Sequence, residues 1–245
     1  MSTWRGLWRV ASPPGFYALA TGMLPWLWTV FGVLLVMGVY GAFTAPPDYQ
    51  QGEGYRLIFV HVPAAWMSLF IYVCMAMMGT ATLVWRGKVS AVCTRASAVP
   101  GASFTFLTLI SGSFWGKPMW GAWWVWDARL TSELILLFLY LGYIALSVSL
   151  PGRNAGARAG ALLLIVGAVN IPIIHFSVDW WNTLHQPATI VKLGAPSIHP
   201  DMLRPLLLMA AAFMVFYAAV FLTTASAMLL EQEKGSKWAR AEAEK

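Results

Sequence analysis

Six apolar stretches, each close to the roughly 20 residues that a bilayer core requires, constrain this chain more than any other feature. They lie at residues 24–44, 62–85, 96–114, 130–150, 157–174 and 203–230. The bilayer core offers the backbone no water to bond, so each stretch is expected to satisfy its own polar groups as an α-helix. The pattern therefore predicts an all-α integral membrane protein, built as a bundle of six transmembrane helices.

Composition agrees with this class and argues against a soluble domain. Of the 245 residues, 59% are hydrophobic and 11% are charged, whereas soluble domains average about 45–50% and 25%. We expect one membrane domain over residues 1–230, followed by a charged cytoplasmic tail over residues 231–245 with no catalytic role. The net charge of +6 is better explained by the positive-inside rule than by nucleic acid, which is not an expected partner.

The distribution of arginine and lysine predicts the orientation of the bundle. Eleven of the 16 such residues fall on the side that carries both chain ends: Arg5, Arg9, Arg86, Lys88, Arg95, Arg153, Arg158, Lys234, Lys237, Arg240 and Lys245. The other five are Arg56, Lys117, Arg129, Lys192 and Arg204. Positive residues concentrate in cytoplasmic connections. Both termini are therefore predicted to be cytoplasmic, and the connections 45–61, 115–129 and 175–202 to face outward.

The outward connection 115–129 is unusually rich in tryptophan. It begins WGKPMWGAWWVWD and contains five indoles, those of Trp115, Trp120, Trp123, Trp124 and Trp126. One or two tryptophans at a helix end serve as interfacial anchors, and five in one loop exceed that need. The loop is predicted to form a platform for a flat, apolar ligand at the membrane surface.

All four histidines also fall on the predicted outer side: His61, His175, His185 and His199. Neutral imidazole is a common metal ligand and a usual axial ligand of haem iron. A single histidine at a membrane interface is more commonly a hydrogen-bonded structural residue, so the histidines alone leave both interpretations open. Their convergence with tryptophans and arginines on one face favours a ligand site.

Two arginines outside the cytoplasmic side need an explanation. Arg56 lies five residues before His61, and Arg129 follows Asp127 at the start of the fourth span. A guanidinium binds carboxylates in bidentate fashion, so either could hold an acidic group of a ligand; a structural ion pair, such as Arg129 with Asp127 or Glu133, is the alternative. Asp127 could cap the fourth span, face the ligand, or do both. Glu133 is an intramembrane acid and a functional candidate.

Other chemistries find little support. The sequence has no Gly-rich phosphate loop, HExxH or GxSxG motif, and Cys74 and Cys93 form no metal quartet, so hydrolysis is not expected. The Ser111, Gly112 and Ser113 triplet is interpreted as small-residue helix packing. Two alternatives stay open. A b-type cytochrome or quinone-linked membrane oxidoreductase would usually carry histidines within its spans, and a small-molecule transporter would need polar residues at mid-membrane.

The tryptophan-rich segment also carries a family resemblance. Residues 115–140, WGKPMWGAWWVWDARLTSELILLFLY, resemble the WWD motif of the haem-handling membrane proteins of cytochrome c biogenesis. Total length, six predicted spans and an outer histidine on either side of the motif extend the resemblance over the whole chain. Within that family they resemble the cytochrome c maturation protein C group, also called haem exporter protein C. The related cytochrome c haem lyases generally have more spans than this chain.

The resemblance implies a site for haem b, bound transiently at the periplasmic face of the bacterial inner membrane. His61 and His185 match the two axial ligands of the iron. The WWD segment would cradle the porphyrin with its five tryptophans and Asp127. The chemistry of the basic residues adds that Arg56, together with Arg129 or Lys117, would neutralise the propionates. His175 is then expected to be buried at a helix end, and His199 to be a loop residue.

The resemblance also implies a delivery role and a set of partners. Haem would be presented to the membrane-anchored periplasmic haem chaperone, maturation protein E. An ABC transporter formed by maturation proteins A and B, and the small single-span maturation protein D, are the other expected partners. The chain is expected to bind and deliver haem and not to act as an enzyme.

Overall fold

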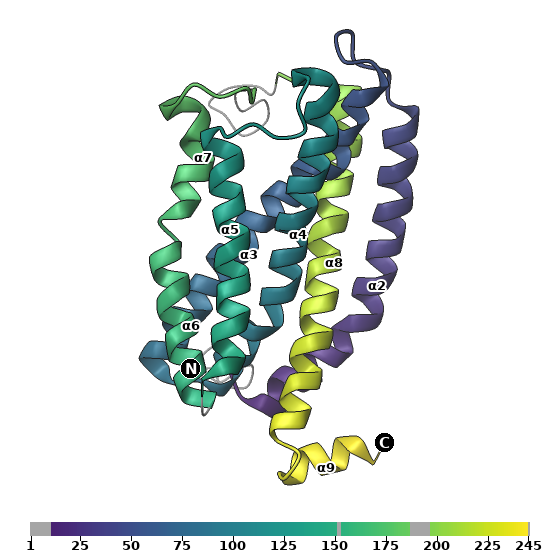
Figure 1. Ribbon diagram of the computed structural model, residues 1–245. Coiled ribbons are helices and arrows are strands. Elements are labelled where there is room, and N and C mark those ends of the chain that lie inside the picture. Colours follow the sequence, from purple (N-terminus) through teal and green to yellow (C-terminus); the bar gives the residue numbers. More distant parts are fainter. Residues whose placement is uncertain (1–10, 151–152, 187–196, 245) are drawn as a thin grey trace, which may run out of the picture.

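The computed structural model describes residues 11–150, 153–186 and 197–244 (Figure 1). The charges of Arg5, Arg9, Lys192 and Lys245, which contribute to the predicted orientation, lie outside these residues. The described chain is helical, and its elements are α2 (Pro13–Thr44), η1 (Glu53–Leu57), α3 (Ile58–Trp85), α4 (Lys88–Trp120), α5 (Ala128–Ser149), α6 (Arg153–Gly167), α7 (Asn170–Trp180), α8 (Pro200–Gln232) and α9 (Lys237–Ala243).

Five segments of the described chain are long and apolar enough to cross a membrane: Pro13–Thr44, Glu53–Trp85, Ala128–Ser149, Asn154–Trp180 and Pro200–Gln232. The prediction of an all-helical membrane protein with several spans is thereby confirmed. The third predicted span, 96–114, lies within α4, which is not apolar enough by the same measure. α4 is nevertheless 33 residues long and runs beside the other helices through the bundle (Figure 1).

The helices extend beyond the predicted spans at several ends. α2 begins at Pro13, well before residue 24, and α7 continues to Trp180. The loop expected over 115–129 is helical as far as Trp120, so only residues 121–127 connect α4 to α5. α4 ends where Gly121 adopts a left-handed conformation with φ of 74°, which glycine tolerates without a Cβ penalty.

The predicted fifth span, 157–174, is interrupted in the structure. It consists of α6 and α7, separated by Ala168 and Val169. Pro172 has no N–H to donate to the carbonyl four residues earlier, which weakens an α-helix at this point. The buried Asn170 side chain donates to the backbone carbonyl of Ser132 on α5 at 2.9 Å. The break is therefore fastened to the neighbouring helix.

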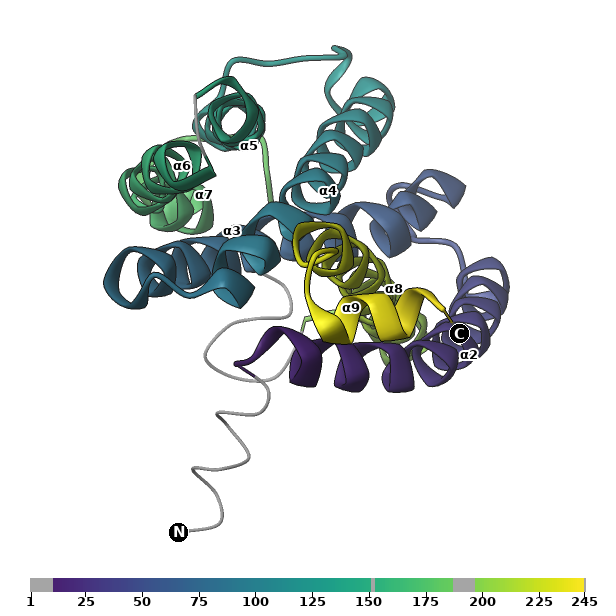
Figure 2. The same ribbon diagram turned by 90° about the horizontal axis from the view of Figure 1, so that it is seen from below.

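The bundle is organised around α3 and α4. Viewed along its length, these two helices lie between α8 and α2 on one side and α5, α6 and α7 on the other (Figure 2). α2 approaches α8 closely because Gly38 and Gly41 face it. A Cβ at these positions would lie 2.7 Å from Met209 Sδ and 2.8 Å from Pro205 Cβ. Small residues that allow such backbone approach are typical of membrane helix packing.

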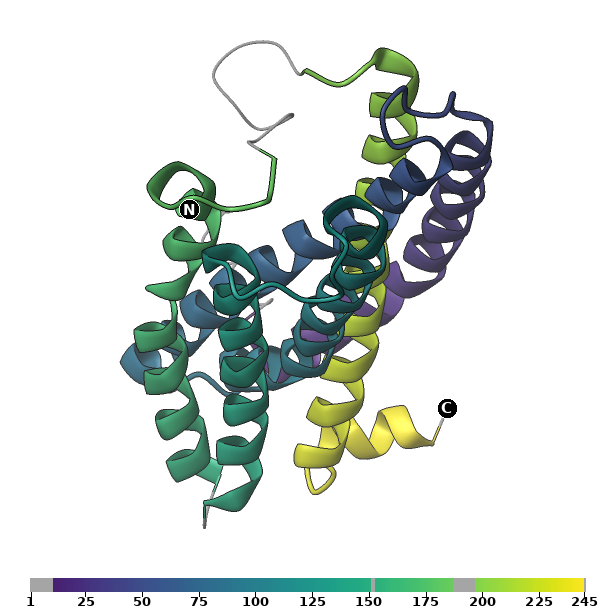
Figure 3. The ribbon, with the colours of Figure 1, turned by 45° about the horizontal axis from the view of Figure 1, so that its top comes forward.

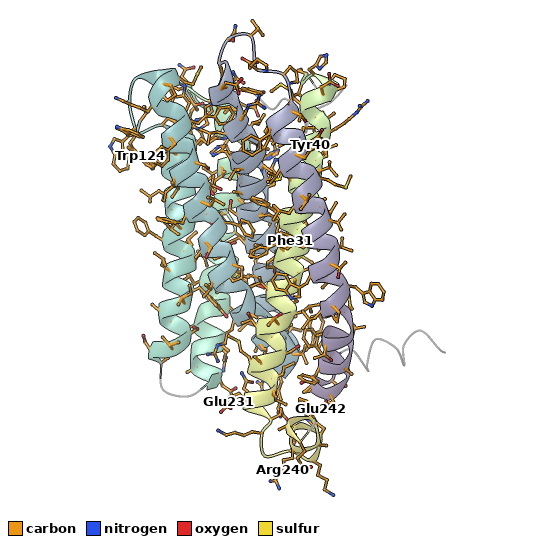
Figure 4. All side chains as sticks on the ribbon, turned by 90° about the vertical axis from the view of Figure 1, so that its right-hand side faces the viewer. Phe31, Tyr40, Trp124, Glu231, Arg240 and Glu242 are labelled. Atoms are coloured by element: carbon orange, nitrogen blue, oxygen red, sulfur yellow. The ribbon has the colours of Figure 1, made fainter. Side chains whose placement is uncertain are left out.

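The two ends of the bundle differ in character. One end carries η1, the 121–127 connection and residues 181–186 (Figure 3). The other end carries the start of α2 and the short α9, which lies across the bundle axis (Figure 1). The charged residues Glu231, Arg240 and Glu242 lie at this second end, far from Trp124 (Figure 4). The expected tail over 231–245 thus comprises the last turn of α8, a bend and α9.

Candidate functional site

His61 lies in the first turn of α3, where the end of α4 holds its ring in place. Its Nδ1 is 3.0 Å from the hydroxyl oxygen of Ser111. The Ser111 hydroxyl already donates its single proton within α4, at 2.6 Å to the carbonyl of Leu107. Since that oxygen can then only accept from the ring, we infer that Nδ1 carries the proton of the neutral imidazole and that Nε2 is the nitrogen available to a metal. The ring also has a backbone hydrogen bond to Thr108.

The space for this ring depends on a glycine. A Cβ added to Gly112 would lie 3.0 Å from His61 Cε1, tighter than ordinary packing allows. Ser111 and Gly112 therefore position the imidazole, and the expectation that this triplet serves only helix packing was incomplete. The sequence did carry a signal, because two hydroxyls and a glycine occur one turn before the tryptophan-rich segment.

His185 is also held through its Nδ1, in this case by Asp127. Its Nδ1 is 3.0 Å from Asp127 Oδ2, and the two side chains are 17% and 6% exposed. A carboxylate accepts, so Nδ1–H donates and Nε2 again carries the free lone pair. Burial lowers the pKa of His185 below its ordinary value, against the opposing effect of Asp127. The neutral imidazole, which is the ligating form, is thereby favoured.

Asp127 has two roles at once. Its Oδ1 accepts from the backbone N–H of Leu130 at 2.8 Å and so caps the start of α5, while Oδ2 faces His185. The capping role considered from sequence is confirmed, whereas the role of facing the ligand stays a prediction. A carboxylate that fixes the tautomer and orientation of an imidazole is the usual support of a histidine ligand.

Two tryptophans of α4 contact the two histidines. The Trp115 ring lies edge-on to His61, with centroids 5.6 Å apart, and the Trp120 ring lies 4.9 Å from His185. Trp115 is fixed in turn by an Nε1–H donated to Gln51 Oε1 at 2.8 Å. These two indoles are helical, contrary to the loop expected for them, and one helix thereby connects both imidazoles.

The remaining three tryptophans lie in the connection from α4 to α5. Trp123 and Trp126 are 54% and 74% exposed. Trp124 packs against Trp126 at 5.4 Å, and its buried indole N–H has no hydrogen-bond partner among the described residues. A buried donor without an acceptor is costly, so this N–H is suited to an acceptor supplied by a ligand.

The two arginines predicted to face outward differ in their partners. Arg56 donates to the Glu53 carboxylate and to the carbonyl of Ala42, which fastens η1 to the end of α2. Among the described residues, Arg129 donates to neutral acceptors, the Ser177 hydroxyl at 3.2 Å and the carbonyls of Ile174 and His175. Of the two cations, Arg129 is the one whose charge has no carboxylate within 4.0 Å in the described part of the chain.

Arg129 is also close enough to both histidines to interact with them electrostatically, as the histidines do with each other. The structure thus brings together His61, His185, Asp127, Arg129 and the α4 tryptophans. The structural ion pair considered for Arg129 with Asp127 or Glu133 is not among the ion pairs of the described residues, whereas Arg56 does form such a pair.

Other candidate residues lie apart from this cluster. His175 is exposed on α7 against Phe176, so the expectation of a buried histidine was wrong. His199 is the exposed N-cap of α8, and its ring accepts from Asp201 N–H at 3.3 Å. Glu133 is fully inside the bundle and accepts from the Ser68 hydroxyl at 2.8 Å.

This geometry allows a metal to be held by two imidazoles. Each Nδ1 lies 3.0 Å from an oxygen that can accept, and among the described residues no hydrogen bond is assigned to either Nε2. Among the described residues, no group of three or more histidine, cysteine or acidic side chains could enclose a bare ion. The two imidazoles can hold a metal, the indoles beside them suit a flat ring, and the guanidinium of Arg129 suits an acidic group. A metal bound in a planar macrocycle with acidic substituents would match all three features.

Comparison with known proteins gives the family. Residues 6–240 match the family model described as haem exporter protein C. The chain belongs to the haem exporter protein C family. A haem exporter protein C of Escherichia coli (strain K12) is 46% identical over 236 residues, which cover 96% of this chain and 95% of that protein.

Two further relatives extend the comparison beyond one group of bacteria. A haem exporter protein C of Bradyrhizobium diazoefficiens is 49% identical over 213 residues, 87% of this chain and 81% of that protein. A ccmC-like mitochondrial protein of cytochrome c biosynthesis from Marchantia polymorpha is 46% identical over 198 residues, 80% and 84% of the two chains. The resemblance inferred from the tryptophan-rich segment is confirmed at the level of the family.

Proposed function

We propose that the chain binds haem b through His61 and His185 and presents it for cytochrome c biogenesis. The observation that carries the proposal is the shared state of the two imidazoles. Ser111 and Asp127 accept from Nδ1 of one ring each, which leaves both Nε2 atoms free to ligate iron. Two axial imidazoles leave no open coordination position, so the bound haem is protected from oxygen chemistry.

The site faces the periplasm in a protein with six spans and cytoplasmic termini. α4 supplies the sixth span despite its lower apolar content, because it packs against α3, α5 and α8. The described chain begins and ends at the end of the bundle opposite the histidines (Figure 1). The excess of arginine and lysine at that end favours its cytoplasmic location in the inner membrane.

The porphyrin is held by apolar contact and by its acidic groups. Trp115 and Trp120 lie beside the two ligands and cover part of the macrocycle. Arg129 is the better propionate partner, since the guanidinium of Arg56 is engaged by Glu53. The buried Trp124 N–H offers a further donor to a propionate oxygen.

The exposed rim of the site suits delivery of haem to another protein. Trp123 and Trp126 expose apolar surface beside the proposed binding position, and such surface is typical of protein contacts. We assign this rim to the membrane-anchored haem chaperone, maturation protein E, with a vinyl edge of haem left accessible to it. Maturation proteins A and B, an ABC transporter, and the single-span protein D complete the assembly. In this role the chain is a binding and delivery component and not an enzyme.

Absorption spectroscopy of the detergent-purified protein tests the proposal. We expect the sharp, split bands of six-coordinate bis-histidine haem in the reduced wild type, and their loss in His61→Ala and in His185→Ala. His175→Ala and His199→Ala are matched controls, because these imidazoles lie outside the site, and both should keep the bands. Full haem occupancy in either site variant would contradict the ligand assignment, and bands that survive in both would favour a b-type cytochrome with ligands elsewhere.

A further inference from the structure

A groove on the surface of the bundle lies between α4 and α8, away from the histidines. Its volume is about 460 Å³. Two rows of residues line it at four-residue spacing. One row runs from Arg95 through Val99 and Ser103 to Leu107 on α4, and the other from Phe216 to Met228 on α8. α4 and α8 lie side by side in both the lengthwise and the end-on views (Figures 1 and 2).

The groove has the length of one membrane leaflet. Twelve residue steps at a rise of about 1.5 Å give a length of about 18 Å, and half of a bilayer core of about 30 Å is about 15 Å. It begins near the end of the bundle that carries α9 and stops near the middle of α4. Its walls are mainly apolar, with the hydroxyls of Ser103 and Thr224 as exceptions.

A cation, Arg95, lies at the end of this apolar groove that is nearer to α9. Arg95 lies two turns into α4, about 10 Å from its first residue. Two lysines at this end of the bundle form ion pairs, Lys88 with Glu233 and Lys234 with Glu231, both at 2.7 Å. Arg95 has no acidic partner within 4.0 Å in the part of the chain that the structure describes.

We infer that the α4–α8 groove binds an anionic phospholipid of the cytoplasmic leaflet, with the phosphate on Arg95 and an acyl chain along the groove toward Leu107. An acyl chain matches the apolar walls, and the phosphate matches a guanidinium that has no carboxylate. The length of a single leaflet favours a lipid over a partner's transmembrane helix, which would need a groove across the whole bilayer. Such a helix would also have to carry an acidic residue inside the membrane, which is rare.

Native mass spectrometry of the full-length protein in detergent tests this inference. The probes are phosphatidylglycerol and phosphatidylcholine with the same acyl chains. We expect phosphatidylglycerol to bind more tightly to the wild type. In Arg95→Gln this lipid should bind about fivefold more weakly, the loss expected for one arginine near a membrane surface. Arg158→Gln is the matched control, since it removes an exposed cation on α6 at the same end of the bundle.

A second variant tests the acyl chain separately from the head group. Val99 is 61% exposed on the wall of the groove, so Val99→Trp fills the groove without disturbing the bundle core. Both lipids should bind more weakly to it, while the haem spectrum of both variants stays that of the wild type. Equal binding of the two lipids to the wild type, or unchanged phosphatidylglycerol binding in Arg95→Gln, would overturn the inference. Weaker capture of a partner subunit by Arg95→Gln, with lipid binding unaltered, would overturn it in favour of a protein occupant.

Discussion

The double role of Asp127 gives the sharpest prediction, because its two carboxylate oxygens serve different partners. Oδ1 caps α5 through Leu130 N–H, and Oδ2 orients His185. Asp127→Ser separates the two roles. Serine is as good an N-cap as aspartate, but its side chain is one bond shorter and carries a single oxygen, so a serine that caps α5 cannot also hold the imidazole.

The expected magnitudes differ between affinity and stability. Loss of the residue that orients a histidine ligand typically costs 10- to 100-fold in metal affinity. We therefore expect Asp127→Ser to bind haem roughly 10- to 100-fold more weakly and to keep its thermal stability. Asp127→Ala should show the same loss of affinity and an additional destabilisation of about 1 kcal/mol from the missing cap.

Haem titration of the apo-protein, followed by absorption, gives the affinity, and thermal unfolding in the same detergent gives the stability. Asp179→Ser is the control for charge, because Asp179 is exposed on α7 and affects Arg129 electrostatically, but makes no contact with His185. Wild-type haem affinity in Asp127→Ser, together with reduced stability in Asp127→Ala, would refute the orienting role and leave Asp127 as a helix cap alone.

Two further substitutions test contacts of the site, and a third tests the packing of α4 against α5. Ser111→Ala should weaken haem binding about tenfold, measured by the same titration. Ser113→Ala is the control and should leave the affinity unchanged, because its hydroxyl donates within α4. Equal haem affinities of the two variants would exclude Ser111 as a support of the ligand. Arg129→Gln should weaken binding of haem more than binding of its dimethyl ester, while Arg56→Gln should affect both little; an equal loss for haem and ester in Arg129→Gln would remove its propionate role. Gly101→Ala should lower the free energy of unfolding by about 1–3 kcal/mol, because the new Cβ would lie 2.2 Å from a buried tyrosine ring of α5, and denaturant titration showing no change would contradict this.

The sequence was sufficient for the family and for an all-helical membrane fold, because both depend on residue type. Tryptophans, histidines and an arginine on one predicted face were enough to indicate a ligand site. The sequence was not sufficient for the loop boundary. Lys117 in the last turn and Gly121 directly after it are the usual signs of a helix C-terminus, but the tryptophans and Pro118 favoured a loop from residue 115.

The partners of the two arginines could not be read from spacing. Arg56 precedes His61 by five residues, yet its guanidinium turns to Glu53 and to the end of α2. Arg129 has Asp127 and Glu133 nearby in sequence, yet it donates across to α7. The Arg56–Glu53 pair is local, three residues apart, whereas the contacts of Arg56 with Ala42 and of Arg129 with α7 join distant segments that neither helical periodicity nor charge pattern encodes. The break between α6 and α7 is similar, since it is fastened by Asn170 to a carbonyl of α5.

The low apolar content of α4 follows from what this helix does. It contacts α3, α5 and α8, so much of its surface faces protein and not lipid, and it need not be apolar on every side. Its small and hydroxyl residues allow close approach, as at Gly101 against Tyr140 and Gly112 against His61. The same helix supplies the acceptor for one imidazole and the indole beside the other. A helix that is largely covered by other helices can carry polar residues, because the neighbouring helices, and not lipid, surround its polar groups. Such a helix is therefore a suitable place for a polar site within an apolar bundle.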